Sequence, residues 1–130
     1  MYYYFSMNNK IKIRAKELIS RSYSPYSHFR VAAVVKCADG SLFDGVNVEN
    51  ASYSLTMCAE RSAVFNAVSH GCRDIESIFI YSDSSSMPYP CGACLGVLSE
   101  FNKDMKVIVA SNSKEEQFTL SELLPRQFSL

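Results

Sequence analysis

Cys58-Ala59-Glu60-Arg61 and Pro90-Cys91-Gly92-Ala93-Cys94 are the two short stretches around which the 130-residue chain is organised. Together they supply three cysteine thiols and one carboxylate. A structural zinc site takes four protein ligands, whereas a catalytic zinc takes three and keeps a position for water. The residue types therefore favour an open catalytic zinc site with a separate acid/base group.

Each cysteine stretch is expected to begin a helix, and a helix N-terminus stabilises thiolate through its partial positive charge. We therefore expect Cys58, Cys91 and Cys94 to hold a zinc ion. Arg61 and the two helix ends would offset the excess negative charge of three thiolates. Glu60 would not ligate the metal, but would take a proton from the activated water and pass it on.

Two other interpretations of the cysteines remain. A histidine as fourth ligand would close the zinc site and leave no position for water. His70 lies roughly 18 Å along the helix from Cys58, too far to share its metal, whereas His28 in a Ser/Tyr/Pro loop stays a candidate. A metal-free C-x-x-C redox pair would leave Cys58 and Glu60 without a role.

The composition argues against several classes of protein. Thirteen basic residues balance thirteen acidic ones, whereas nucleic-acid-binding domains usually carry a basic face. No stretch reaches the roughly 18 consecutive apolar residues of a membrane span, and the first seven residues lack the basic region of a signal peptide. We therefore expect a soluble, cytoplasmic protein that binds neither nucleic acid nor membrane.

The five cysteines are an odd number, and three of them have metal-like spacing. This usage favours a reducing compartment over a disulfide framework. Cys37 lies in an apolar run and Cys72 follows a helix end, so both are expected to be structural.

Hydrophobic patterning predicts a tail over residues 1–7 and a single domain over residues 8–130. Helices are expected over about 8–22, 58–70 and 91–101, with a closing turn at 120–124. Strands are expected at 31–37, 41–48, 75–81, 107–110 and 117–119. This order predicts an α/β domain with a mixed five-stranded sheet covered by helices.

The two cysteine stretches resemble the signature of the zinc-dependent cytidine deaminases. The resemblance covers nearly everything from about Ser24 to Phe128, which makes it more specific than either motif alone. It extends to three further stretches, Tyr26-Ser27-His28-Phe29-Arg30-Val31-Ala32-Ala33, Gly45-Val46-Asn47-Val48-Glu49-Asn50-Ala51-Ser52-Tyr53 and Glu122-Leu123-Leu124-Pro125.

The resemblance implies the three-layer α/β/α fold of the small homotetrameric members of this family. These enzymes hydrolyse cytidine and 2′-deoxycytidine to uridine and 2′-deoxyuridine with release of ammonia, a reaction of pyrimidine salvage. Their zinc ligands, one ion per subunit, match Cys58, Cys91 and Cys94. Their proton shuttle matches Glu60, and Arg61 matches a residue that hydrogen-bonds the zinc thiolates.

Substrate-binding positions also follow from the resemblance. The backbone of the residue matching Ala59 contacts the pyrimidine, and Phe29 matches a ring that stacks beside the base. Asn47 and Glu49 match a pair that holds the ribose 3′-hydroxyl, and their spacing of two places both on one strand face. A solvated strand edge would account for the same pair without any ligand.

Two aromatic residues match subunit contacts in the family. Phe128 is the nearest match to an aromatic residue that reaches into a neighbouring subunit's pocket, and Tyr53 matches a position at the subunit contact near the site. The resemblance therefore implies a homotetramer whose pockets are completed by neighbouring subunits. Taken alone, Phe29 or Phe128 would more often be a core residue.

One departure from the family and two alternatives complete the sequence interpretation. Leu95-Gly96 follow Cys94 where the family usually has Arg-Gln, which leaves Arg61 as the nearby cation in the motifs. The enzymatic alternative is a deaminase of another nucleoside, a nucleoside antibiotic or a base within RNA. The alternative from another class is a zinc-stabilised interaction module without catalysis, which predicts that Glu60 is dispensable.

Overall fold

The first helix begins earlier than the sequence predicts. The structure, a computed structural model, describes residues 2–130. In it α1 spans Tyr2–Leu18, and a 3-10 turn, η1, spans Ile19–Arg21. The backbone of most of the predicted tail is therefore helical, and Met1 lies outside the described residues. The tail contains neither Pro nor Gly, so nothing in its sequence stops the helix from extending toward the N-terminus.

Five strands form one mixed sheet within residues 2–130, as the sequence predicts. They are β1 Val31–Cys37, β2 Leu42–Val46, β3 Ile75–Ser82, β4 Lys106–Ala110 and β5 Glu115–Thr119. Their order is β2-β1-β3-β4-β5, in which β3 and β4 pair in parallel and all other neighbours are antiparallel. In the centre, Ile80 lies opposite both Ala33 and Val109. The three central strands, β1, β3 and β4, are mostly buried and largely apolar because helices cover both faces of the sheet, whereas the edge strand β5 is mostly polar.

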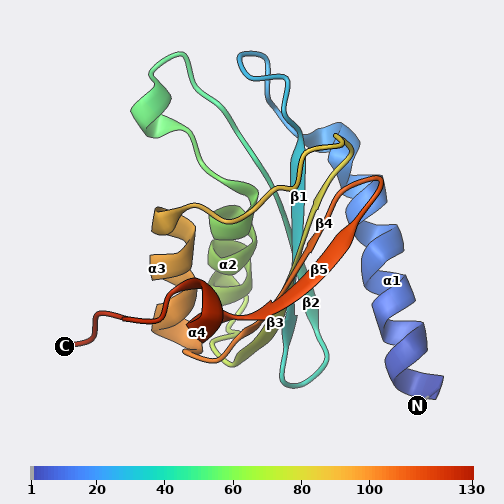
Figure 1. Cartoon of the computed structure of the whole chain (residues 1–130), viewed down its shortest axis with the longest axis vertical. Helices are drawn as coiled ribbons and strands as arrows, with labels where there is room; N and C mark the ends of the chain where they lie inside the picture. The colour runs from blue at the N-terminus through green and yellow to red at the C-terminus, as the bar shows by residue number, and fades with distance from the viewer. Residues whose placement is uncertain (1) are drawn as a thin grey trace.

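Helices form a layer on each face of the sheet, with α1 on one side (Figure 1). The other side carries α2 Ala59–Ser69, α3 Gly92–Phe101 and α4 Leu120–Leu123. Each layer encloses its own core; that under α1 includes Ile11, Ala15, Val34 and Phe79, and the other includes Ala63, Val64, Ile78, Leu98 and Val107. This arrangement confirms the three-layer α/β/α fold. Among the described helices, none combines the length and the hydropathy required to cross a membrane.

Strand β2 and helix α2 touch through their backbones at Gly45. A Cβ atom at this position would lie 2.3 Å from the backbone N of Ala63 and 2.4 Å from the carbonyl O of Ala59. Because glycine has no Cβ, α2 can lie directly on β2. The contact fixes the start of α2, which follows Cys58, relative to the end of β2, which leads to Asn47.

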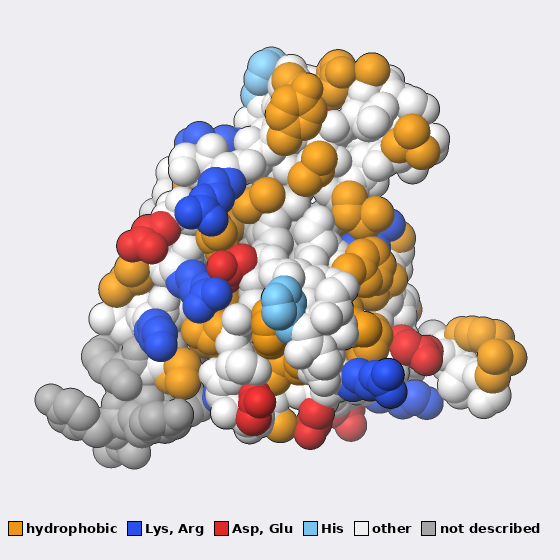
Figure 2. Space-filling model, turned by 180° about the vertical axis from the view of Figure 1, so that it is seen from behind, with side chains coloured by type: hydrophobic (Ala, Val, Ile, Leu, Met, Phe, Trp, Pro, Cys, Tyr) orange, Lys and Arg blue, Asp and Glu red, His pale blue; other side chains and the backbone are white. Residues whose placement is uncertain are grey.

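Two connections project beyond the sheet at the end where α2 and α3 begin (Figure 1). One joins η1 to β1, and the other joins β2 to α2 and contains the 3-10 turn η2, Tyr53–Leu55. The rings of Tyr26 and Tyr53 meet edge to face with centroids 5.9 Å apart. Figure 2 shows hydrophobic side chains gathered on this projection. Tyr26, Tyr53 and Leu55 are exposed on this projection.

Cys37 and Cys72 form a disulfide. This bond was not predicted from the sequence, because the cysteine usage indicated a reducing compartment and no disulfide framework. The bond joins the end of β1 to the connection between α2 and β3. The two cysteines meet because β1 pairs with β3, which brings Cys37 opposite Ile75, three positions beyond Cys72. This pairing links strands that are not consecutive in the sequence, and the cysteine spacing alone does not reveal it.

Candidate active site

The three predicted zinc ligands meet at the starts of two helices. Cys58 is the N-cap of α2, Cys91 is the N-cap of α3, and Cys94 lies in the first turn of α3. Cys91 Sγ lies 4.0 Å from Cys58 Sγ and 3.6 Å from Cys94 Sγ. A tetrahedral zinc with Zn–S bonds of about 2.3 Å separates its sulfur ligands by roughly 3.8 Å. The thiols are therefore spaced as a tetrahedral zinc requires.

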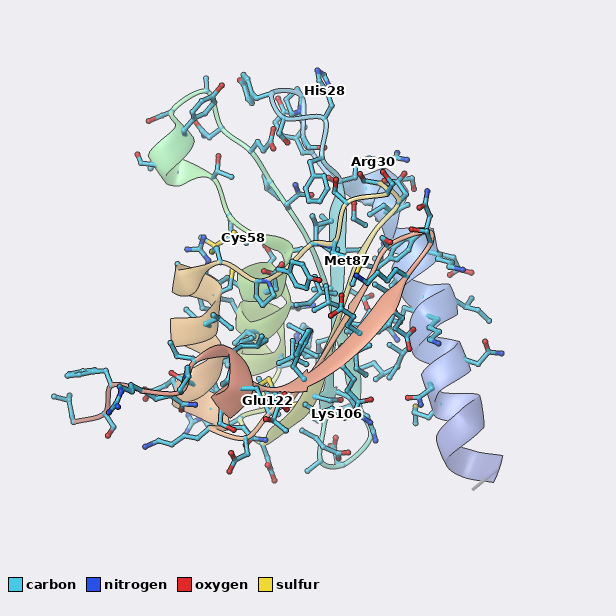
Figure 3. The ribbon with its side chains drawn as sticks, viewed as in Figure 1. His28, Arg30, Cys58, Met87, Lys106 and Glu122 are labelled. Atoms are coloured by element: carbon cyan, nitrogen blue, oxygen red, sulfur yellow. A yellow bond between two sulfur atoms is a disulfide. The ribbon has the colours of Figure 1, made fainter. Side chains whose placement is uncertain are left out.

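A histidine does not complete this cluster. Within residues 2–130, the group of side chains close enough to share a metal consists of the three thiols. His70 is the C-cap of α2, at the end opposite Cys58. His28 lies at the tip of its loop and points away from Cys58 (Figure 3). The closed site with a histidine ligand is therefore not formed, and a fourth position is left for water.

Arg61 donates a hydrogen bond from Nη2 to Cys58 Sγ at 3.3 Å. The pKa of Cys58 falls to about 5, first because the Cys94 thiol donates a hydrogen bond to its thiolate and second because Arg61 does so. The same donated bond, together with burial, raises the pKa of Cys94. Without a metal, Cys58 is therefore the thiol of this pair that ionises more readily, and binding of zinc releases the protons of its cysteine ligands.

The Leu95-Gly96 departure leaves no cation on α3, whose sequence GACLGVLSEF contains neither Lys nor Arg. Leu95 packs against the core instead, and a Cβ atom at Gly96 would meet nothing within 4 Å. The charge of the thiolates is therefore opposed by Arg61 from α2 and by the two helix N-termini.

Glu60 lies in the first turn of α2 and is only 6% exposed. Burial raises the pKa of its carboxyl group. It borders a cavity of about 240 Å³ that also reaches Cys58 and Cys91. A carboxyl group in this position can carry a proton between two atoms of a substrate bound in the cavity.

The same cavity brings together most of the predicted substrate-binding residues. Its complete lining is Ser27, Phe29, Val31, Asn47, Glu49, Thr56, Met57, Cys58, Ala59, Glu60, Pro88, Tyr89 and Cys91. Asn47 and Glu49 follow β2 and line the same cavity as Cys58 and Cys91, the N-caps of α2 and α3. The polar side chains of Asn47 and Glu49 and the predicted zinc ligands Cys58 and Cys91 therefore border one cavity large enough for a small ligand.

Tyr53 and Phe128 do not line this cavity. Tyr53 is 72% exposed on η2, and Phe128 is 84% exposed on the segment that follows α4. Neither residue reaches the zinc ligands within its own chain, so any part that they take in the site requires a neighbouring subunit.

Sequence reasoning missed six residues that line the cavity, namely Ser27, Val31, Thr56, Met57, Pro88 and Tyr89. Ser27 lies within a stretch that carries the family resemblance, and Tyr89 lies two positions before Cys91, so both stood beside recognised motifs. The Tyr89 hydroxyl donates a hydrogen bond to Glu116 on β5 at 2.6 Å. The pairing of Tyr89 with β5 is a tertiary contact that the motifs do not encode.

Comparison with known proteins shows the family of this chain. A family model for the cytidine and deoxycytidylate deaminase zinc-binding region matches residues 6–111. The chain belongs to the cytidine deaminase family. A cytidine deaminase from Halalkalibacterium halodurans is 43% identical over 122 residues, which cover 92% of this chain and 90% of that protein. The crystal structure of cytidine deaminase from Burkholderia pseudomallei has 35% identity and a TM-score of 0.87, and the match covers 92% of this chain and 98% of that one.

A deaminase with a different name is also similar. A blasticidin-S deaminase from Bacillus cereus is 31% identical over 123 residues, which cover 88% of this chain and 87% of that protein. The cytidine deaminase family comprises zinc-dependent hydrolases, and the three-thiol cluster fits one zinc ion per chain.

Proposed function

We propose that this cytidine deaminase family member hydrolyses cytidine and 2′-deoxycytidine to uridine and 2′-deoxyuridine, with release of ammonia, in pyrimidine salvage. The observation that carries the proposal is the single cavity that joins Glu60 and the zinc-ligand thiols to Asn47 and Glu49. A nucleoside has a base to present to the first group and sugar hydroxyls to present to the second. The cavity therefore has residues that can act on the base and residues that can bind the sugar hydroxyls.

Zinc held by Cys58, Cys91 and Cys94 supplies Lewis-acid activation of water when it is bound. Glu60 takes a proton from the attacking water and delivers it to the substrate. The bond between C4 and the exocyclic nitrogen breaks, the amino group leaves as ammonia, and the water oxygen becomes O4 of the uridine. In the proposal, Ala59 contacts the pyrimidine through its backbone.

The charge of the cavity supports a nucleoside rather than a nucleotide. Its lining contains the carboxylates of Glu49 and Glu60 and, among the described residues, no Lys, Arg or His. A phosphate monoester carries about −1.5 to −2 charge at pH 7 and would be repelled. Cytidine therefore suits this lining better than deoxycytidylate, and the balanced net charge argues against a base within RNA.

A nucleoside antibiotic is the second candidate substrate, and the similarity to a blasticidin-S deaminase supports keeping it. A zinc-stabilised module without catalysis is less well supported, because it gives no reason to bury the Glu60 carboxyl group beside the cavity.

We further propose that residues 8–130 form the catalytic domain and that the active form is a cytoplasmic homotetramer. The exposed Tyr53 and Phe128 support subunit contacts, with Phe128 completing a neighbour's pocket. The free, metal-spaced thiols of Cys58, Cys91 and Cys94 support a reducing location, and the Cys37–Cys72 disulfide stands against it. Sedimentation of the zinc-loaded protein is expected to show a tetramer, and a fully active monomer would contradict this assembly.

The test of the reaction is the loss of cytidine absorbance in the ultraviolet with purified, zinc-loaded protein. Wild-type protein is expected to convert cytidine and deoxycytidine but not deoxycytidylate. Glu60→Gln is expected to retain zinc and lose about 10²–10⁴-fold in kcat, because the proton relay is removed. Wild-type protein that holds zinc yet changes neither nucleoside would disprove the proposal, and faster turnover of blasticidin S than of cytidine would favour the second candidate.

A further inference from the structure

Ser27 connects Glu49 to Phe29. Its hydroxyl donates a hydrogen bond to Glu49 Oε2 and accepts one at 3.0 Å from the backbone N–H of Phe29. The other carboxylate oxygen of Glu49 accepts the backbone N–H groups of Tyr26 and Ser27, each at 3.0 Å. Glu49 therefore holds the turn ahead of Phe29, and the Ser27 hydroxyl extends this hold to Phe29 itself.

The turn needs such support because His28 has a positive φ of 57°. This left-handed conformation is unfavourable for a residue with a Cβ. The His28 N–H donates to the carbonyl O of Ser24 at 3.0 Å, while the His28 side chain points out from the loop tip in Figure 3. The hydrogen bonds of the turn, including those of Ser27, therefore keep the backbone in this conformation.

Both backbone polar groups of Phe29 are bound by side chains. Its N–H binds Ser27, and its carbonyl O accepts a hydrogen bond from Asn47 Nδ2 at 2.8 Å. Phe29 lies outside the β ladder, because β1 begins at Val31. The peptide planes on either side of Phe29, and with them the direction of its ring into the cavity, thus depend on Ser27 and Asn47.

We propose that Ser27 is a positioning residue that sets the Phe29 ring against the pyrimidine base. The inference rests on the proposed function, in which Phe29 stacks beside the base. The Ser27 hydroxyl acts through Phe29, and the chemical step at Glu60 does not involve it. Loss of the hydroxyl therefore weakens the binding of substrate and product alike and leaves kcat nearly unchanged.

The first test compares Ser27→Ala with the conservative Ser27→Thr. Ser27→Ala is expected to raise the KM for cytidine and the Kd for uridine about tenfold, the effect of losing one well-ordered hydrogen bond. Ser27→Thr keeps a hydroxyl and is expected to stay within about threefold of wild type. Unchanged KM and Kd in Ser27→Ala would overturn the proposal.

A second substrate separates Phe29 from Glu49 as the target of Ser27. With 3′-deoxycytidine the sugar hydroxyl proposed to bind Glu49 is absent, but the base still stacks. Ser27→Ala is expected to raise the KM of cytidine and of 3′-deoxycytidine by the same factor. A rise confined to cytidine would overturn the proposal, because Ser27 would then act on the sugar-binding carboxylate.

Amide hydrogen exchange tests the positioning without any substrate. The Phe29 N–H is expected to exchange at least about tenfold faster in Ser27→Ala and to stay protected in Ser27→Thr. Ser41→Ala is the matched control, because the Ser41 hydroxyl donates to the Asp39 carboxylate at 2.6 Å in the β1–β2 turn, at the other end of β1. Equal exchange in Ser27→Ala and wild type would overturn the proposal. If the wild-type protein had no deaminase activity, the proposed function would be disproved. The exchange rate of the Phe29 N–H would still show whether Ser27 holds Phe29 in place.

Discussion

Helix starts carry the zinc side of the cavity. Connections outside the helices carry the side that we propose to hold the sugar and to stack on the base, named the sugar side. Glu60 lies in the first turn of α2 and Cys94 in the first turn of α3. Asn47 and Glu49 follow the end of β2, and Phe29 precedes the start of β1. The two sides therefore differ in what holds their side chains in place.

Backbone hydrogen bonds within a helix and a packed core hold the zinc side; Ala59 and Cys94 are almost fully buried. Side chains bonded to neighbouring backbone hold the sugar side, as Asn47 does for Phe29. A site on a regular element is more rigid than one on a loop. Substitutions on the zinc side should therefore abolish deaminase activity, whereas substitutions on the sugar side should reduce it by amounts that differ from residue to residue.

The largest effect is expected for Cys94→Ala, which removes a buried thiol that we propose as a zinc ligand. The variant should fail to retain zinc through purification and lose more than about 10³-fold in activity, because the metal activation of water is lost. Zinc is measured with a chromogenic chelator and activity by cytidine absorbance. The control is the double variant Cys37→Ser/Cys72→Ser, which should keep its zinc. A Cys94→Ala protein with full zinc content would contradict the assignment of the ligands.

A smaller effect is expected for Asn47→Ala. The variant leaves the carbonyl O of Phe29 without its donor, and the N–H of Val31 without the Asn47 Oδ1 acceptor that it reaches at 3.0 Å. Steady-state kinetics should show a KM for cytidine raised about 10- to 100-fold, with a much smaller change in kcat. Zinc content should equal that of wild type. Loss of zinc from Asn47→Ala would show that the two sides are not independent.

The smallest effect concerns pH and Glu49. The Ser27 hydroxyl, followed by the N–H groups of Ser27 and Tyr26, lowers the pKa of Glu49 below its ordinary value of 4.5. A carboxylate with a lowered folded-state pKa contributes stability above the unfolded pKa, and this contribution is lost as the pH falls through the folded pKa.

Thermal unfolding of wild type and Glu49→Gln at matched pH values measures this contribution. Wild type should unfold about 1–2 °C above the variant at pH 7, because the carboxylate is near the surface, and the difference should shrink below pH 4.5. Comparing the two proteins at each pH cancels the loss of zinc in acid. A difference that grew toward low pH would contradict the assigned hydrogen bonds.

The sequence predicted the elements well where apolar periodicity was strong and breakers were clear. Gly71 ends the second predicted helix as expected, with a positive φ of 91°. The predicted start of α1 was wrong because the Tyr-rich opening shows no helical periodicity of apolar residues and contains no Gly or Pro to mark a boundary. The Cys37–Cys72 bond depended on the pairing of β1 with β3, which no local pattern specifies.

The candidate site divides in the same way. The cysteines and Glu60 occur in compact motifs whose spacing carries their geometry, so their meeting at two helix starts could be predicted. The spacing of Asn47 and Glu49 indicated a polar pair, but not that the pair would hold the Ser27–Phe29 turn. That contact spans about twenty residues between two connections, and it arises only when the sheet is assembled.

The backbone contact at Gly45 limits how this pocket can change. No side chain separates β2 from α2 at this point, so exchanging one core residue for another cannot change the distance between Glu60 and the residues that follow β2. Selection for a larger or smaller substrate must therefore act on the connections around Ser27 and Thr56. The spacing between β2 and α2 is thus a property of the scaffold, whereas the connections that line the cavity can change in sequence without moving α2 on β2.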